Sequence, residues 1–273
     1  MLWTRITSGQ LDEARVSCAE TCLLPFGCLE RHSDHLPLGT DSMLAYRLAE
    51  LAAESEPAVV FPPQHYMMVA SAASHSGAVV FDAKLSMQIV ETVVSEIARN
   101  GFHKIIFYNF HGGNRNILPL LLQNHLTQGP ADTVLYLPRF DWEIEDVYKT
   151  YCSSDFGGHA DEWETSLMLA LFPETVSMQD VPTDDVGRSR KRLSVLHEKR
   201  IKTPVDFFAD FPTHYAGESK SASAEKGEQA VRAITTRLAE VIRTVKQDRK
   251  APELLLEFRQ GMKSAGESSR RSG

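Results

Sequence analysis

The sequence predicts an α/β domain: a layered α/β/α arrangement around a mostly parallel central sheet. Three observations support this class. Short apolar runs alternate with longer amphipathic stretches, prolines or glycines end several of these segments, and the 273 residues are 42% hydrophobic. Alternation of strands and helices is typical of parallel sheets, because each crossover between parallel strands carries a helix. A chain of this length can also bury a sizeable core.

The elements follow from the local patterns, taken in chain order. Apolar runs predict four strands, at 21–27, 58–63, 103–110 and 132–138. The second of these ends in two prolines, which stop a strand. Apolar residues at helical spacing predict five helices, at 41–55, 84–101, 115–126, 161–172 and 223–248. The helix at 84–101 ends in a glycine, a common helix stop.

The rest of the chain shows fewer periodic patterns. Residues 173–222 hold most of the later prolines, so we expect irregular segments that cover the domain. Residues 261–273, "GMKSAGESSRRSG", are small and polar and predict a frayed or flexible tail. We therefore expect a single domain over 1–260 and no second one.

Composition excludes several classes of protein. The net charge is −7 and the sequence has no basic stripe, which argues against nucleic-acid binding. No apolar run approaches the roughly 20 residues of a membrane helix. The first ten residues lack a signal-peptide pattern, so we expect a cytoplasmic protein with four reduced cysteines. The basic segment 188–200 is interpreted as a solvated face, with an anion or subunit contact as the alternative.

Titratable side chains gather at the predicted carboxyl ends of strands. The loop "FGCLERHSDHLPLGTD" (26–41) carries Glu30, His32 and Asp41 directly after the first strand. His111 follows another strand in "NFHGGN", where Gly112 and its neighbour let backbone come close to a ligand. A third cluster is "HADEWETS" (159–166). Ligands bind at the carboxyl ends of strands in open parallel sheets.

Carboxylates and imidazoles in such a place predict a divalent metal site. Imidazole suits zinc, iron or manganese, and carboxylate oxygens suit manganese. Two ions about 3.5–4 Å apart can share a carboxylate and activate water together. The alternative is that these groups are surface loop residues and helix caps. On that alternative, Asp41 is the N-cap of the helix that follows it.

The same residues carry a resemblance to a known family. "LPFGCLERHSDHLPLGTD" (24–41) resembles the signature of the creatininase (creatinine amidohydrolase) family. Three further segments resemble later motifs of that family and occur in the same order: "NFHGGNRN" (109–116), "HADEWETSLMLALFP" (159–173) and "SASAEKGE" (221–228). Four motifs in order make the resemblance specific over most of residues 20–228.

The resemblance implies a layered α/β/α fold, a site with two divalent metal ions and a hexamer built from dimers. Carried over by position, Glu30 and His111 would bind one ion, His32 the other, and Asp41 would bridge them. His159 would act as acid and base near the scissile group, a role that suits neutral imidazole near pH 7.

Departures from the family pattern affect the second ion and the pocket. Where creatininase itself has a metal-binding glutamate two positions after the strand-end histidine, this chain has Gly113. Glu164 is then our choice for the missing ligand and a candidate catalytic group, and Glu162 is the alternative. A tryptophan–aspartate pair used on creatinine is replaced by Asp155 and Phe156, which argues against creatinine as substrate.

The segment that often lines the pocket in the family is altered as well. It contains His75 and Ser76 in place of the usual motif. The substrate-pocket candidates are therefore His75, Ser76, Gly112, Asp155, Phe156 and Glu162.

Three hypotheses follow. The first is a metal-dependent amidohydrolase that uses two zinc, manganese or iron ions on a small cyclic amide, a formamide or a related C–N bond. The second keeps the fold and metals but acts on an inosose-type cyclic ketone or trims a peptide during cofactor maturation. The third is a binding protein without catalysis, which would need a lost ligand such as the one at Gly113. A small-molecule substrate and a homo-oligomer are expected under the first.

Overall fold

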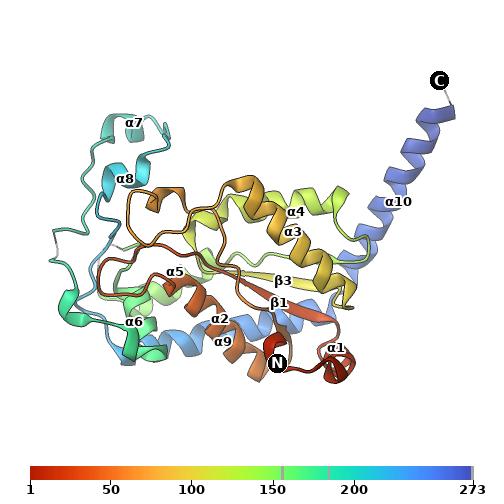
Figure 1. Ribbon diagram of the computed structural model, residues 1–273, viewed down its shortest axis with the longest axis horizontal. Helices are drawn as coiled ribbons and strands as arrows, with labels where there is room; N and C mark the ends of the chain where they lie inside the picture. Colours follow the sequence, from red (N-terminus) through yellow and green to blue (C-terminus); the bar gives the residue numbers. More distant parts are fainter. Residues whose placement is uncertain (155–156, 184, 272–273) are drawn as a thin grey trace.

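The computed structural model describes residues 1–154, 157–183 and 185–271. At its centre is a parallel sheet of four strands in the order β2-β1-β3-β4 (Figure 1). The strands are β1 (Thr21–Phe26), β2 (Val59–Val60), β3 (Lys104–Asn109) and β4 (Val134–Tyr136). Each lies within an apolar run that predicted it, and the predicted fold class is confirmed.

Helices cover both faces of the sheet, because successive side chains of a strand point to opposite sides. Leu23 and Ile106 pack on one face with side chains from α2 (Thr40–Ser55), α6 (Glu162–Leu171) and α9 (Ala224–Gln247). Leu24 and Phe107 pack on the other face with side chains from α1 (Leu11–Ser17), α3 (Ala83–Arg99) and α4 (Ile117–Gln128). All five predicted helices are therefore present, with ends shifted by one or two residues.

Several elements are not predicted by the sequence. Besides α1, they are α5 (Phe140–Tyr151), α7 (Ser194–Glu198), α8 (Asp206–Asp210), α10 (Lys250–Arg271) and six 3-10 turns, at Trp3–Arg5, Ser8–Gln10, Ala70–Ala72, Gly112–Arg115, Pro173–Thr175 and Met178–Asp180. In Figure 1, α10 extends away from the layered part of the molecule. It continues as helix to Arg271 through the expected tail, whose flexibility stays a prediction, as does the single domain over 1–260.

The sheet register fixes where the loops leave. Phe26 and Asn109, the last residues of β1 and β3, are partners across the two strands. The loops that follow them therefore start side by side at one edge of the sheet. Of the helices in the described part of the chain, none combines the length and apolar character needed to cross a bilayer.

Candidate metal centre

The loop after β1 turns back sharply to reach α2. Gly27 makes this possible, because a Cβ atom there would lie 2.4 Å from the backbone nitrogen of Ser42. Real side chains do not tolerate such a distance, so the start of α2 can press against the loop only at a glycine. This packing brings Asp41, in the first turn of α2, close to the end of β3.

Asp41 lies inside α2 and not ahead of it. The helix begins at Thr40, and Gly39 occupies the N-cap position. The Asp41 carboxylate instead faces two imidazoles: Oδ2 lies 3.0 Å from His111 Nδ1, and Oδ1 lies 3.3 Å from His32 Nε2. The interpretation of Asp41 as a helix N-cap is therefore wrong, and each of its oxygens faces a different histidine.

The first of these oxygens belongs to a group that Asp41 forms with Cys28, Glu30 and His111. His111 Nδ1 is 3.1 Å from Glu30 Oε1, and the Cys28 thiol donates to Asp41 Oδ2 at 3.1 Å. All four side chains are buried, and one polar atom of each lies within 4.8 Å of the others. Cys28 is a free thiol, as expected, but its place beside this group could not be inferred from cysteine spacing.

A second group contains His32, the histidine that the other oxygen of Asp41 faces. Glu164 Oε2, from the first turn of α6, lies 3.7 Å from His32 Nε2. His159 completes this group, with its ring 4.3 Å from the ring of His32. The structure thus brings together Glu30, His32, Asp41, His111, His159 and Glu164, all six of the residues expected to bind metal or act in catalysis.

The negative charges of the cluster are not balanced by lysine or arginine side chains of the described residues. Among the described residues, no lysine or arginine forms an ion pair with Glu30, Asp41 or Glu164. Burial opposes ionisation of Asp41, yet His32 and His111 hold its pKa well below the usual range.

The pKa values of two histidines shift in the opposite direction. Burial lowers the pKa of His32 and His111, but the neighbouring carboxylates outweigh it and raise both to about 10. Burial raises the pKa of Glu164 to about 8. The cluster therefore attracts positive charge strongly, and its oxygen and nitrogen donors suit divalent zinc, manganese or iron.

His159 presents one ring nitrogen to the cluster. Its Nε2 lies 2.7 Å from the carbonyl oxygen of Arg31. A carbonyl can only accept, so Nε2 carries the proton and Nδ1 keeps a lone pair, 3.8 Å from Glu30 Oε1. Burial and the nearby His32 lower the pKa of His159 to about 3. The neutral ring can therefore bind a metal ion, or accept a proton, through Nδ1.

His214 is a member of the site that sequence reasoning missed. Its Nε2 lies 2.7 Å from Glu30 Oε2, and both side chains are buried. The segment around it pairs with the residues before α6 through two backbone hydrogen bonds between His159 and Ala216. No periodicity or motif marks this histidine in the sequence, because it lies in the irregular segment after α8.

Glu162 points away from the cluster. Its carboxylate accepts hydrogen bonds from the backbone nitrogens of Ser153 and Ser154 and from the ammonium of Lys226. Glu164, and not Glu162, therefore lies where a ligand of the second ion would be needed. Nearby, His35 Nε2 lies 2.9 Å from the hydroxyl of Thr165, the residue after Glu164.

Gly113 lies against the outer nitrogen of His111. A Cβ atom on Gly113 would be 2.4 Å from His111 Nε2, which is itself buried and has no hydrogen-bond partner among the described residues. The glycine thus leaves room for the ring orientation that turns Nδ1 toward Glu30 and Asp41.

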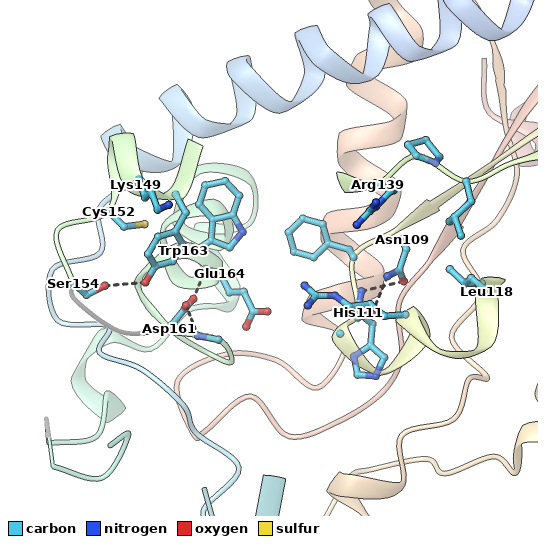
Figure 2. Close-up of a pocket in the computed structure, with 18 of the residues that line it drawn as sticks. Asn109, His111, Leu118, Arg139, Lys149, Cys152, Ser154, Asp161, Trp163 and Glu164 are labelled. Atoms are coloured by element: carbon cyan, nitrogen blue, oxygen red, sulfur yellow. Dashed lines mark hydrogen bonds between the residues drawn. The ribbon is translucent and has the colours of Figure 1, made fainter. Parts of the chain in front are cut away.

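A cavity of about 940 Å³ opens beside the cluster. Figure 2 shows Asn109, His111, Leu118 and Arg139 on one side of it, and Lys149, Cys152, Ser154, Asp161, Trp163 and Glu164 on the other. His111 and Glu164 belong to both the cavity and the cluster, one from each of the two groups of candidate ligands. A molecule in the cavity would therefore contact the centre directly.

The predicted pocket residues are only partly found here. Gly112 lines the cavity, whereas His75, Ser76 and Glu162 do not. His75 instead packs against His214, with ring centroids 5.2 Å apart, and Ser76 is exposed. Asp155 and Phe156 lie outside the described residues.

Comparison with known proteins gives one family. Residues 4–242 match the family model described as creatininase, creatinine amidohydrolase. The 3-dehydro-scyllo-inosose hydrolase of Thermotoga maritima is 26% identical over 88% of this chain and 82% of its own. The creatinine amidohydrolase of Pseudomonas putida is 27% identical over 85% and 92%. The mycofactocin precursor peptide peptidase of Mycolicibacterium smegmatis is 29% identical over 89% and 91%.

Solved structures agree in fold. A crystal structure of a candidate creatinine amidohydrolase from Bacteroides fragilis has a TM-score of 0.75 at 25% identity and covers 92% of this chain and 98% of its own. A creatininase structure named for manganese has a TM-score of 0.70 at 23% identity, over 90% and 99%.

Proposed function

From the membership of this chain in the creatininase family, which the family model shows, we propose that it is a hydrolase that uses two divalent metal ions. Its substrate would be a cyclic amide, a formamide or a related compound with a scissile C–N bond. The observation that carries the proposal is Asp41, whose two oxygens face two separate groups of ligand atoms. Creatininase structures named for zinc and for manganese support the choice of metals.

The ligand assignment follows from the contacts. Glu30 and His111, with one oxygen of Asp41, would hold one ion. His32 and Glu164, with the other oxygen, would hold the second. When bound, a pair of divalent ions polarises a carbonyl and makes water acidic enough to attack it near pH 7.

The remaining residues of the site prepare the centre and move protons. His214 holds the second oxygen of Glu30 and so fixes the orientation of that carboxylate, a common arrangement around metal ligands. The lone pair of His159 Nδ1 can take up a proton and then return it to the leaving nitrogen. The hydrogen bond from Nε2 to the carbonyl of Arg31 keeps the ring in that tautomer.

A second candidate reaction is the opening of a cyclic ketone or the trimming of a peptide. It is supported by the similarity to the inosose hydrolase and to the peptide peptidase. The cavity of about 940 Å³ also leaves room for a substrate larger than a small lactam. The same ligand groups would serve these reactions, so only the substrate distinguishes them. The cytoplasmic location and the hexamer stay predictions.

The experiment combines metal analysis with a substrate panel. The purified protein should contain about two zinc, manganese or iron ions per chain, and His32→Ala should lose metal and activity. His197→Ala, a change of a partly exposed histidine outside the cluster, is the matched control. The panel contains lactams, formamides, an inosose-type ketone and short peptides. Less than one ion per chain, together with full activity of His32→Ala, would overturn the proposal.

A further inference from the structure

The cavity beside the centre is larger and more basic than a small neutral lactam requires. Its volume of about 940 Å³ lies near the upper end of the roughly 300–1,000 Å³ typical of ligand pockets. Two arginines line it: Arg115, at the end of the 3-10 turn after β3, and Arg139, just after β4. Both follow neighbouring strands of the sheet, on the side of the cavity that His111 occupies.

These two guanidinium groups have no acidic partner in the described part of the chain. No carboxylate of the described residues forms an ion pair with Arg115 or Arg139. Other arginines near the site are engaged: Arg31, for example, donates to both oxygens of Asp34 and to the carbonyl of Thr213. Guanidinium groups of this kind match carboxylates and phosphates, which they bind with paired, charge-assisted hydrogen bonds.

The two carboxylates that line the cavity, Asp161 and Glu164, already accept hydrogen bonds from other groups. Asp161 caps α6, accepting hydrogen bonds from the backbone nitrogens of Gly158 and Glu164. Glu164 accepts from the backbone nitrogen of Ala160 and faces His32. Neither carboxylate is placed to neutralise the arginines, and Figure 2 shows both across the cavity from Arg139. The wall that carries the arginines therefore favours an anion.

We infer that the substrate carries an anionic group, a carboxylate or a phosphate, which Arg115 and Arg139 bind while the scissile group lies at the centre. The inference deepens the proposed function, since it assigns a substrate class to the same site. Apolar side chains that also line the cavity, among them Leu118 and Trp163, would contact the body of the molecule.

Matched pairs of ligands test the inference on the metal-loaded protein. One pair is N-formylphenylalanine and its carboxamide, and the other is N-formylglucosamine 6-phosphate and N-formylglucosamine. Within each pair, only the anion differs. Binding is measured by calorimetry and hydrolysis by release of formate. We expect the anionic member of at least one pair to bind about 10- to 100-fold more tightly. The pair that shows the preference distinguishes carboxylate from phosphate.

Variants then assign the preference to residues. The double variant Arg115→Gln/Arg139→Gln should abolish it, with no change in metal content. The double variant Arg190→Gln/Lys191→Gln removes the same charge from the exposed basic segment and should retain it. The inference is overturned by equal binding within both pairs, by a preference that survives loss of the two arginines, or by its loss in the control variant.

The outcomes separate this inference from the proposed function. A preference for anions that depends on the arginines, without hydrolysis of any compound, supports the inference and contradicts the hydrolase. Metal-dependent hydrolysis without any preference for anions contradicts only the inference.

Discussion

Buried charges at the two ends of the parallel sheet differ in whether the chain itself provides their partners. At the amino end of β3, the ammonium of Lys104 donates to the carbonyl oxygens of Val245, Lys246 and Asp248, at 2.9, 2.8 and 2.7 Å. These carbonyls lie at the end of α9, where the helix dipole also favours a cation. At the carboxyl ends of β1 and β3, three carboxylates and four histidines lie together without a lysine or arginine partner among the described residues.

The difference separates a structural charge from a functional one. Lys104 finds all its acceptors within the chain, so its charge stabilises the fold and requires nothing from outside. The carboxylates at the other end rely on protonated histidines to balance them, and those histidines must lose their protons to bind metal. We therefore expect changes at the first end to affect stability and changes at the second to affect metal and activity.

The largest effect we expect is a dependence of metal affinity on pH. His32 and His111 have pKa values raised to about 10 and Glu164 to about 8, so all three hold protons at pH 7 in metal-free protein. Binding of two ions releases two or three protons, and each proton changes affinity about tenfold per pH unit. The combined affinity should then fall by about 100- to 1,000-fold per unit of acidification below pH 8.

Competition with a chromophoric chelator from pH 6 to 8 measures this dependence after removal of metal by dialysis. Calorimetry in two buffers of different ionisation enthalpy counts the protons directly. Glu164→Gln should release one proton fewer. A metal affinity that does not change with pH would show that the metal-free cluster is not protonated. The cluster would then not differ from Lys104 in needing to exchange its protons for metal.

The next largest effect concerns the shared ligand. Asp41→Asn keeps the size of the side chain and removes its charge, so both ions should bind more weakly. We expect a loss greater than the roughly 10- to 100-fold that removal of an outer hydrogen-bond partner causes. Glu30→Gln should disturb mainly one ion. Metal stoichiometry by mass spectrometry distinguishes the two variants, and two ions bound at wild-type affinity in Asp41→Asn would rule out the bridge.

Lys104→Met tests the structural end of the sheet. Loss of the ammonium leaves three carbonyl groups of the α9 terminus without this donor, at a cost of about 2–4 kcal/mol in unfolding free energy. Activity per folded molecule should not change. Urea unfolding with metal held constant measures the loss, and Lys84→Met, at an exposed position of α3, is the control. If Lys104→Met were as stable as wild type but bound less metal, our assignment of a structural end and a functional end of the sheet would be wrong.

The smallest effect is expected at a partly buried ion pair near the same end. Glu56 accepts from Lys246 at 2.6 Å and Arg243 at 3.0 Å, and these bonds lower its pKa below the ordinary value. Its contribution, about 1 kcal/mol or less, is present above the unfolded pKa and lost as pH falls through the lower folded value. Glu56→Gln should therefore differ from wild type at pH 7 and converge with it once pH has fallen below the lowered folded pKa of Glu56. A constant difference in unfolding free energy across this range would contradict the prediction.

Much of the fold could be predicted because its signals are local. The strands and the helices α2, α3, α4, α6 and α9 show apolar runs or helical periodicity within a single window of sequence. The helix α10 was missed because its last residues are small and polar, a composition that predicts a flexible tail. Pro252 lies in the first turn, where its missing N–H costs no hydrogen bond.

The site could be predicted where it depends on strand ends or on the ordered motifs that carry the family resemblance. Glu30 and His111 follow neighbouring strands, so the sheet itself brings them together. His214 contacts Glu30 across 184 residues of sequence, through a segment whose path has no periodic signal. The position of Cys28 beside Asp41 depends on the tight turn at Gly27, which is a matter of packing and not of motif.

Gly113 has a consequence for how such a centre can change over evolution. The imidazole of His111 lies where a side chain at position 113 would begin. A single Gly113→Glu substitution would displace His111 before the new carboxylate could serve as a ligand. Any larger residue at position 113 would therefore need compensating changes around His111, so this one glycine limits which substitutions the centre can accept.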